Sequence, residues 1–462
     1  MTSLSEIKRE VLKRVKPTRE EEQRVWRVVN RVVEKAEEAA RELGVEALIE
    51  VEGSIAKGTW IRGDKDLDVF IILPREMGRE SLKTVGLEIA RRAAGEKWLE
   101  SYAEHPYIEA EIEGFKVDIV PCLRVEKAEE KATAVDRTPF HTRYVKEHLT
   151  EEQKNEVRVL KQFLKGIGAY GAEIKVGGFS GYLCELLVIR YGSFERLVEE
   201  SADWKPPVVI DIEGHYDSPG KAVQVFEAPL IVVDPVDRRR NVAAALTEEK
   251  LCTFIAASRR LLEKPSLNFF WPPPREIPFQ ELIKMVEDRG SHLAALRTGC
   301  PRVASEVLWG QLKKSLRGIE KLLETYGFAV LDARAWSNER EEVVFLFELE
   351  KVLLPRGRVA RGPPIYKREE EKRFLESSRR RILAGPWIAG GRWHVFEERS
   401  YVDARRLLEE KVFSASLGEL MREELRRRRE VLIDAELEKL YREIEEFREE
   451  LADFVVKKPR WL

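Results

Sequence analysis

The sequence predicts a multidomain α+β protein. Its 462 residues are more than one hydrophobic core usually organises, so two to four domains are expected. Up to about residue 121, alternating apolar strands mix with amphipathic helices, and from residue 150 the pattern becomes mainly helical. After the proline-rich linker at 271–274, the order of helices and strands suits a small α+β domain with an antiparallel sheet.

Composition narrows the class of protein. Charged residues make up 35% of the chain, but 81 Lys and Arg nearly balance 83 Asp and Glu, giving a formal net charge of -2. A nucleic-acid partner can therefore be argued only from local clusters of basic residues. The four cysteines are far apart, which argues against zinc sites and a disulfide framework. The N-terminus has no signal-type apolar core and no apolar run approaches a membrane span, so we expect a soluble, cytoplasmic protein.

The first third of the chain shows a mixed pattern. Apolar residues at helical spacing end at Gly44, which is typical of a helix C-terminus. In order, we predict a helix over 19–43, a strand over 45–52, a turn with a short helical stretch over 53–63, a strand over 66–73, a helix over 79–94, and strands over 105–113 and 115–121.

The remaining elements follow from the same rules of spacing. Between residues 150 and 270 we predict helices around 157–167 and 179–187, a strand over 229–233 and a helical run ending near 262. Beyond the linker we predict helices over 279–287 and 304–326, strands over 291–298, 328–335 and 341–354, a basic insertion over 356–381, and one long closing helix through 437–454.

Two aspartates on one strand are the first candidates for chemistry. On a strand, residues two apart share a face, so Asp66 and Asp68 project together while Leu67 points to the other side. Like charges this close need a cation between them, and hard oxygen ligands without His or Cys nearby favour Mg²⁺. Asp118 interrupts an otherwise apolar strand and would complete the ligand set if that strand lies beside the first. The competing interpretation is a solvated start of a strand.

Gly53 and Ser54 precede the Asp-x-Asp pair by eleven residues, and this combination resembles the nucleotidyltransferase signature of the polymerase-β superfamily. Glycine lets the backbone approach a triphosphate, and the Ser54 hydroxyl can donate to its oxygens. The resemblance implies that Asp66, Asp68 and Asp118 are the catalytic metal ligands for two Mg²⁺ ions. Taken alone, the Gly-Ser pair could also be an ordinary turn.

Longer motifs carry a closer resemblance. They are YAEHPY (102–107), VDIVPC (117–122), AVDRTPFH (134–141), NEVRVLKQFLK (155–165), YGAEIKVGGFSGYLCELL (170–187) and VVDPVDRRRNVAA (232–244). Together they resemble the archaeal, class I CCA-adding tRNA nucleotidyltransferases, strongly over about residues 1–270 and more thinly beyond. The resemblance implies addition of C, C and A to the 3′ end of tRNA from CTP and ATP with Mg²⁺.

The family also implies a domain order. A polymerase-β-like nucleotidyltransferase head is expected over 1–148, a helical neck over 149–270, a small α+β body over 275–345 and 400–462, and an inserted basic tail over 346–399. Two rivals stay open. One is another polymerase-β-like RNA nucleotidyltransferase, such as a poly(A) polymerase or an oligoadenylate-type synthetase, and the other is a catalytically inactive RNA-binding relative.

Further site residues follow from matching motif positions. Gly53, Ser54 and Lys57 would contact the triphosphate, although relatives often have arginine where Lys57 stands. Positions that line the nucleotide pocket are Thr138, His141, Lys161 and Tyr170, and Arg240 matches the arginine that selects the base together with tRNA phosphates. Each also has an ordinary structural explanation, such as a turn, a snorkelling lysine or a buried histidine. His105 is a further candidate near the site.

The basic insertion is the expected tRNA contact. Its last residues, Arg379, Arg380 and Arg381, follow a stretch in which cationic and aromatic side chains alternate, a composition that suits RNA phosphates and exposed bases. The alternative is a solvated charged face. The long closing helix could pack within the chain or against a second copy, so a homodimer is possible.

Overall fold

The computed structural model describes residues 3–64, 66–102, 106–126, 133–376 and 381–462. It divides into two compact units, Met1–Pro273 with Arg460–Leu462, and Pro274–Pro459. The division falls inside the expected linker at 271–274. Among the described helices, none combines the length and the apolar character that crossing a membrane requires.

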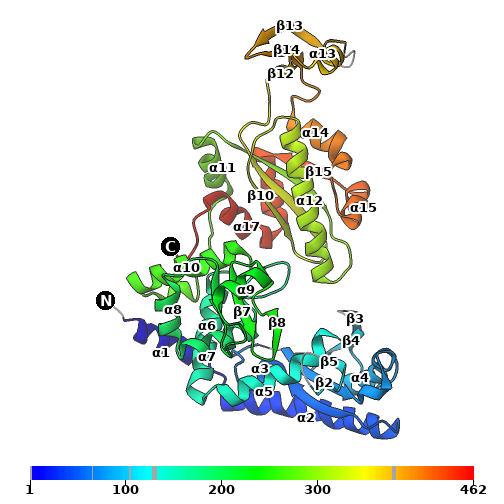
Figure 1. Cartoon of the computed structure of the whole chain (residues 1–462), viewed down its shortest axis with the longest axis vertical. Coiled ribbons are helices and arrows are strands. Elements are labelled where there is room, and N and C mark those ends of the chain that lie inside the picture. The colour runs from blue at the N-terminus through cyan, green and yellow to red at the C-terminus, as the bar shows by residue number, and fades with distance from the viewer. Residues whose placement is uncertain (1–2, 65, 103–105, 127–132, 377–380) are drawn as a thin grey trace. The chain divides into compact units, whose positions relative to one another are not determined.

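The first unit begins with a five-stranded mixed sheet (Figure 1). The strands are β1 (Leu48–Glu52), β2 (Asp66–Leu73), β3 (Trp98–Tyr102), β4 (Pro106–Ile112) and β5 (Phe115–Leu123), in the spatial order β1-β2-β5-β4-β3. β2 and β5 run parallel and the other neighbours are antiparallel. Helices α2 (Arg19–Glu42) and α4 (Leu87–Ala94) bury one face of the sheet. On the other face a smaller buried cluster covers Phe70, Ile72 and Val120, so the part available for a site is the end at which β2 begins.

Several elements of this unit were not predicted from the sequence, among them α1 (Leu4–Val15) and β3. Helix α1 starts with a capping box between Ser3 and Glu6 and packs into the core of the helical part. β3 forms the outer edge of the sheet, and its described side chains are exposed or half-buried with no strong alternation. The predicted helix over 79–94 begins instead with a single π-helical segment, Leu82–Gly86, before α4.

The rest of the first unit is helical, as expected. Its helices are α5 (Thr138–His148), α6 (Glu151–Gly166), α7 (Gly181–Tyr191), α8 (Phe194–Ser201), α9 (Pro219–Phe226) and α10 (Glu248–Glu263). A small sheet of β6 (Val208–Ile210), β7 (Leu230–Asp234) and β8 (Asp237–Asn241) lies among them. All five residues of β7 are buried, so this strand is anchored in the core.

The second unit contains the expected antiparallel sheet, in the order β10-β11-β9-β15. Its strands are β9 (His292–Gly299), β10 (Val330–Ser337), β11 (Glu342–Leu349) and β15 (Glu430–Ile433). Side chains of α12 (Ser305–Thr325), α14 (Ala404–Lys411) and α15 (Glu419–Arg427) share a core with one face. The other face shares a core with α11 (Phe279–Asp288) and α17 (Glu445–Val456). Every residue of the central strand β11 is buried, which explains its continuous apolar run.

The basic insertion forms a small three-stranded sheet of its own. It consists of β12 (Gly357–Pro364), β13 (Ile382–Ala389) and β14 (Arg392–Glu398) in the order β12-β14-β13, with α13 (Arg368–Leu375) packed on β12.

The prediction of one long closing helix is wrong. The segment divides into a 3-10 turn over Asp434–Leu437, α16 (Glu438–Glu443) and α17. The break is at Ile444, whose backbone is extended and whose side chain is buried. The change of direction lets Leu440, Ile444 and Phe447 all enter the core shared with α11, and α17 then packs on α11 within the same chain.

Candidate active site

Four carboxylates form a row across the open face of the first sheet. Asp68 of β2 lies opposite Asp118 of β5, Glu52 of β1 lies opposite Asp68, and Glu109 of β4 lies opposite Asp118. Directly opposed residues on neighbouring strands share a face, so all four side chains project together. The expectation that the strand of Asp118 lies beside that of Asp68 is confirmed. The pattern of single residues predicted Asp68 and Asp118, whereas Glu52 and Glu109 became visible only through strand pairing.

Burial and mutual repulsion make this row unfavourable without a cation. Burial raises the pKa of Asp118 to about 6, with further contributions from the charges of Asp68 and Glu109. Burial also raises the pKa of Asp68, and the neighbouring Asp66 adds to the effect. The pKa of Glu52 rises to about 7, mainly because its side chain is buried. Positive charge placed beside the row would therefore stabilise the ionised carboxylates.

Lys116 supplies part of that charge. Its Nζ lies 3.3 Å from Glu109 Oε2 and 3.5 Å from Asp118 Oδ1. Asp118 Oδ1 is nevertheless buried and accepts no hydrogen bond from any described residue. Asp66 lies two residues before Asp68, opposite Lys116, and is exposed. Lys116 thus compensates part of the negative charge of the carboxylate row. One oxygen of Asp118 still accepts no hydrogen bond from the described residues.

The donor set fits a hard divalent cation. Among the described residues, no group of three His, Cys, Asp or Glu side chains is gathered closely enough to hold a metal ion as it stands. Asp68 and Asp118 are direct neighbours on adjacent strands, and Asp66 lies two residues before Asp68 on the same face of the sheet. Carboxylate oxygens on a rigid sheet, one of them without a hydrogen-bond donor, are what a hard divalent ion requires.

Gly53 is required by the position of Asp68. It opens the short helix α3 (Gly53–Lys57) with a positive φ of 68°, and a Cβ at this position would lie 1.9 Å from Asp68 Oδ2. Only glycine satisfies both conditions. Ser54 follows in the same helical turn and is half-buried. The sequence explained this glycine by the approach of a phosphate, and the structure adds the approach of a carboxylate.

Lys57 lies at the end of α3 and is buried against α7. Its Nζ donates to Glu185 Oε2 at 2.6 Å, and the hydroxyl of Thr59 donates to Glu185 Oε1 at 2.5 Å. The Nζ of Lys161, on α6, donates to the backbone carbonyl of Thr59 at 3.0 Å. Two cations and one carboxylate therefore join the sheet portion to the helices. Glu185 was missed, although a charged residue within the apolar stripe of α7 was a usable signal.

Lys161 and Tyr170 converge at the start of α7. A Cβ on Gly181 would lie 3.4 Å from the Tyr170 hydroxyl and 3.6 Å from Lys161 Nζ. Burial lowers the pKa of Lys161 and raises that of Tyr170. Because Lys161 is almost inaccessible to solvent, it is not a snorkelling surface lysine.

His141 and Arg240 converge on a residue that the sequence did not identify. His141 Nε2 lies 2.9 Å from Asp234 Oδ2, and Arg240 Nη1 donates to the same oxygen at 2.8 Å. The ring of Tyr182 stacks on His141 with centroids 4.1 Å apart, and its hydroxyl donates to Asp234 Oδ1 at 3.2 Å. Thr138 begins α5, one helical turn before His141, and is half-buried.

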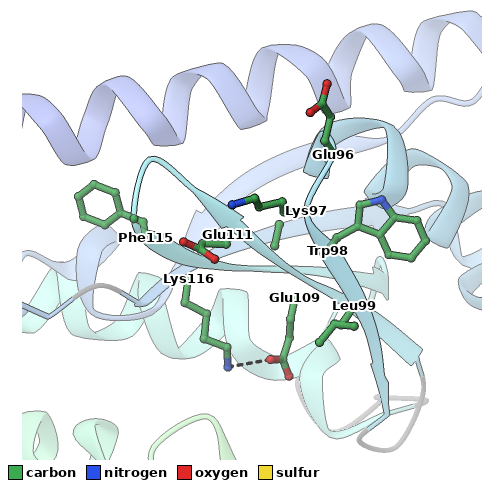
Figure 2. A pocket seen from close by; sticks show the side chains of 10 residues that line it. Glu96, Lys97, Trp98, Leu99, Glu109, Glu111, Phe115 and Lys116 are labelled. Carbon is green, nitrogen blue, oxygen red and sulfur yellow. Dashed lines mark ion pairs between the residues drawn. The ribbon is translucent and has the colours of Figure 1, made fainter.

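Pockets adjoin the carboxylate row and the Arg240 cluster. A pocket of about 680 Å³ is bordered by Arg240, Asn241 and Ser180. A second pocket of about 620 Å³ lies at the β3 edge of the sheet, where Trp98 and Leu99 stand beside Glu109 and Lys116 (Figure 2). The ion pair drawn in Figure 2 joins Lys116 to Glu109, which ends the carboxylate row, so this second pocket begins at that end of the row.

The remaining predicted residues lie elsewhere. Arg381, in the second unit, is exposed and donates to Glu398 Oε2 at 3.0 Å. His105, Arg379 and Arg380 lie outside the described residues. A pocket of about 820 Å³ in the second unit has Arg381 in its wall together with other arginines.

Comparisons with known proteins cover nearly the whole chain. Family models match at 33–141 (nucleotidyltransferase domain), 155–271 (tRNA nucleotidyltransferase, second domain) and 289–434 (CCA-adding enzyme, C-terminal domain). The chain is 42% identical over 398 residues to the CCA-adding enzyme of Methanothermobacter thermautotrophicus, covering 85% of both chains. It is 40% identical to that of Methanosarcina acetivorans, covering 94% of this chain and 96% of the relative. It is 39% identical to that of Haloarcula marismortui, covering 92% and 93%.

Proposed function

The chain belongs to the archaeal-type CCA-adding tRNA nucleotidyltransferases, and from this premise we propose how its residues add C, C and A to the 3′ end of tRNA. The main support for this activity is the sequence identity of 40% to two CCA-adding enzymes along nearly their full length. The substrates are tRNA, CTP and ATP, and the family uses divalent metal ions.

We assign Asp66, Asp68 and Asp118 as the ligands of Mg²⁺. The proposal is supported by the opposed pair Asp68 and Asp118, by the oxygen of Asp118 that accepts no hydrogen bond from the described residues, and by the hard oxygen donors that all three carboxylates offer. When bound, Mg²⁺ ions would lower the pKa of the attacking hydroxyl and neutralise charge on the triphosphate. Lys116 would hold Asp118 ionised until the ions arrive.

In the reaction the 3′ hydroxyl of the tRNA gives up its proton to solvent, and its oxygen forms a bond to the α-phosphorus of the nucleotide. The bond from that phosphorus to the bridging oxygen breaks, and pyrophosphate leaves with the electron pair. In this proposal the protein's main contribution is to position the reacting groups. The carboxylates are fixed on adjacent strands, and the Ser54 hydroxyl beside Gly53 would donate to the phosphates.

The nucleotide would lie between the sheet and the helices. Gly53, Ser54 and Lys57 would hold the triphosphate, and the pocket beyond would be lined by Thr138, His141, Lys161 and Tyr170. Lys57 donates to Glu185 and Lys161 donates to the carbonyl of Thr59, so two cationic side chains lie where the sheet meets the helices. Arg240 and backbone phosphates of the tRNA would together contact the incoming base. The guanidinium of Arg240 is partly exposed at the 680 Å³ pocket, which supports this role.

We assign tRNA binding to the second unit. The four-part division into head (1–148), neck (149–270), body (275–345 and 400–462) and tail (346–399) remains our proposal for how the chain divides this work. The exposed Arg381 and the arginine-lined pocket near it would contact RNA phosphates.

Two further assignments concern the state of the protein in the cell. We propose a cytoplasmic location, to be checked by cell fractionation. We also keep the homodimer as a proposal, although α17 packs within its own chain and so gives no support for one. Light scattering at several protein concentrations would decide between monomer and dimer.

The test of the function uses purified protein, tRNA lacking its 3′ terminus, Mg²⁺, and CTP or ATP supplied singly and together. We expect two C residues from CTP alone and a complete CCA end from both nucleotides. Long A tails from ATP alone would instead indicate a poly(A) polymerase type. Binding of tRNA without any incorporation would indicate a catalytically inactive relative.

A further inference from the structure

Asp234 is the most completely satisfied buried carboxylate near the proposed nucleotide pocket. It ends β7, a strand whose other four residues are apolar, and its side chain is inaccessible to solvent. A buried charge is costly unless partners compensate it. A carboxylate buried at the end of an apolar strand therefore needs partners that donate hydrogen bonds to it and compensate its charge.

Three elements meet on this carboxylate. Oδ2 is shared by His141 Nε2 of α5 at 2.9 Å and Arg240 Nη1 of β8 at 2.8 Å. Oδ1 accepts from the Tyr182 hydroxyl of α7 at 3.2 Å and from the backbone N–H of Val236 at 3.1 Å. With both oxygens engaged twice, the carboxylate cannot rotate without losing hydrogen bonds.

Tyr182 makes the arrangement more rigid. Its ring stacks on His141 at an interplanar angle of 25°, and the Arg240 guanidinium carbon lies 5.9 Å from the ring centroid. The same ring has Lys57 Nζ at 5.6 Å. One aromatic side chain thus touches both residues that Asp234 holds, so displacement of any one would disturb the others.

The pairing also determines which nitrogen of His141 carries the proton. Burial tends to raise the pKa of Asp234, but hydrogen bonds and charge from His141 and Arg240 outweigh it and lower that pKa to about 2. The carboxylate is therefore an acceptor at neutral pH, and His141 Nε2 must donate to it. In the neutral imidazole, Nδ1 is then the acceptor. Burial lowers the pKa of His141, with the charges of Arg240 and Lys57 acting in the same direction against Asp234.

We propose that Asp234 is the positioning residue of the nucleotide pocket, and that it aligns His141 and Arg240 together so that one carboxylate sets both contacts to the incoming nucleotide. The inference rests on the proposed roles of His141 and Arg240. It assigns to Asp234 no contact with substrate. Its effect is exerted through the two side chains that it orients.

The experiment compares Asp234→Asn with Asp211→Asn. Asp211 follows the neighbouring strand β6 and accepts a hydrogen bond from the Tyr216 backbone N–H at 2.8 Å, so it controls for loss of a carboxylate in the same sheet. KM and kcat are measured for CTP on tRNA lacking CCA and for ATP on tRNA ending in CC. We expect Asp234→Asn to raise KM for both nucleotides at least about tenfold, the size of one lost charged hydrogen bond. The tRNA dissociation constant should be unchanged, and Asp211→Asn should stay within about threefold of wild type.

A spectroscopic measurement separates positioning from simple stability. Histidine ¹⁵N spectra, assigned with His141→Gln among the six histidines, should show the proton of His141 on Nε2 in the wild type. In Asp234→Asn the amide can donate as well as accept, so the Nε2–H form should lose population. A merely structural role would lower the melting temperature and leave KM and the tautomer unchanged.

Two further sets of variants keep the outcomes distinct. If Asp234→Asn does not fold, Asp234→Glu retains the charge but displaces it by one methylene, and it should still raise both KM values. Unchanged KM values in a folded Asp234 variant would overturn the inference while leaving the proposed function intact. Unchanged KM values in His141→Ala and Arg240→Ala would overturn the nucleotide roles themselves, and the positioning role with them.

Discussion

Replacing Gly53 with alanine should separate catalysis from RNA binding. A Cβ at Gly53 would stand 1.9 Å from Asp68 Oδ2, whereas Cβ atoms essentially never approach a heavy atom within 3.0 Å. The carboxylate oxygen must therefore move by about 1.1 Å. A displacement of this size at a reacting centre costs about 100-fold in rate, so we expect kcat for CMP transfer to fall by about two orders of magnitude. The tRNA dissociation constant should not change, because neither residue is assigned to RNA.

The matched control is Gly44→Ala. Gly44 has a φ of 66°, close to the 68° of Gly53, and a Cβ there would meet nothing within 4 Å. Both substitutions carry the same backbone penalty of about 1–2 kcal/mol for a left-handed residue, measurable by urea unfolding. Only Gly53→Ala also displaces Asp68. If its kcat stays within about threefold of the Gly44→Ala value, the argument that Gly53 protects the position of Asp68 is wrong.

Three other predictions concern the metal site, the buried Asp234 and the basic insertion. Asp68→Asn should abolish nucleotide addition and weaken Mn²⁺ binding measured by electron paramagnetic resonance, with tRNA affinity unchanged; a parallel loss of tRNA binding would mean that the site is misplaced. Because the pKa of Asp234 is lowered to about 2, its stabilisation of roughly 2 kcal/mol should be complete above pH 4 and be lost as the pH falls through 2. Unfolding free energies of wild type and Asp234→Asn should therefore converge in acid, and a constant difference would contradict this. Neutralising Arg379, Arg380 and Arg381 should weaken tRNA binding and flatten its dependence on salt; an unchanged slope would make them an ordinary solvated face.

Local pattern was enough wherever one element determined the outcome. The alternation of β2 placed Asp66 and Asp68 on one face and Leu67 in the core, as the structure has them. An isolated Asp in an apolar strand singled out Asp118, and pairing of β2 with β5 bears out the expected neighbourhood. The same reasoning would have found Asp234, which ends an apolar strand, and Glu185, which interrupts an apolar helical stripe.

The sequence could not show partners that lie far apart along the chain. Glu185 meets Lys57 across 128 residues, and Asp234 meets His141 across 93. Nothing in the spacing of either residue specifies such a contact, because it depends on how helices pack against the sheet. The break at Ile444 is a similar case, since an apolar period suited to one helix is equally compatible with two that share a core.

By itself the sequence determined the class of the protein, its metal-binding carboxylates as candidates, and the family, because short periodicities and ordered motifs are properties of consecutive residues. Only the tertiary structure decided that Gly53 must leave room for Asp68, that Lys57 is buried against Glu185, and that one carboxylate, Asp234, holds both His141 and Arg240. The physical reason is that burial and charge compensation depend on distances in space. Those distances are set by the packing of whole elements, which the order of residues constrains only through the complete fold.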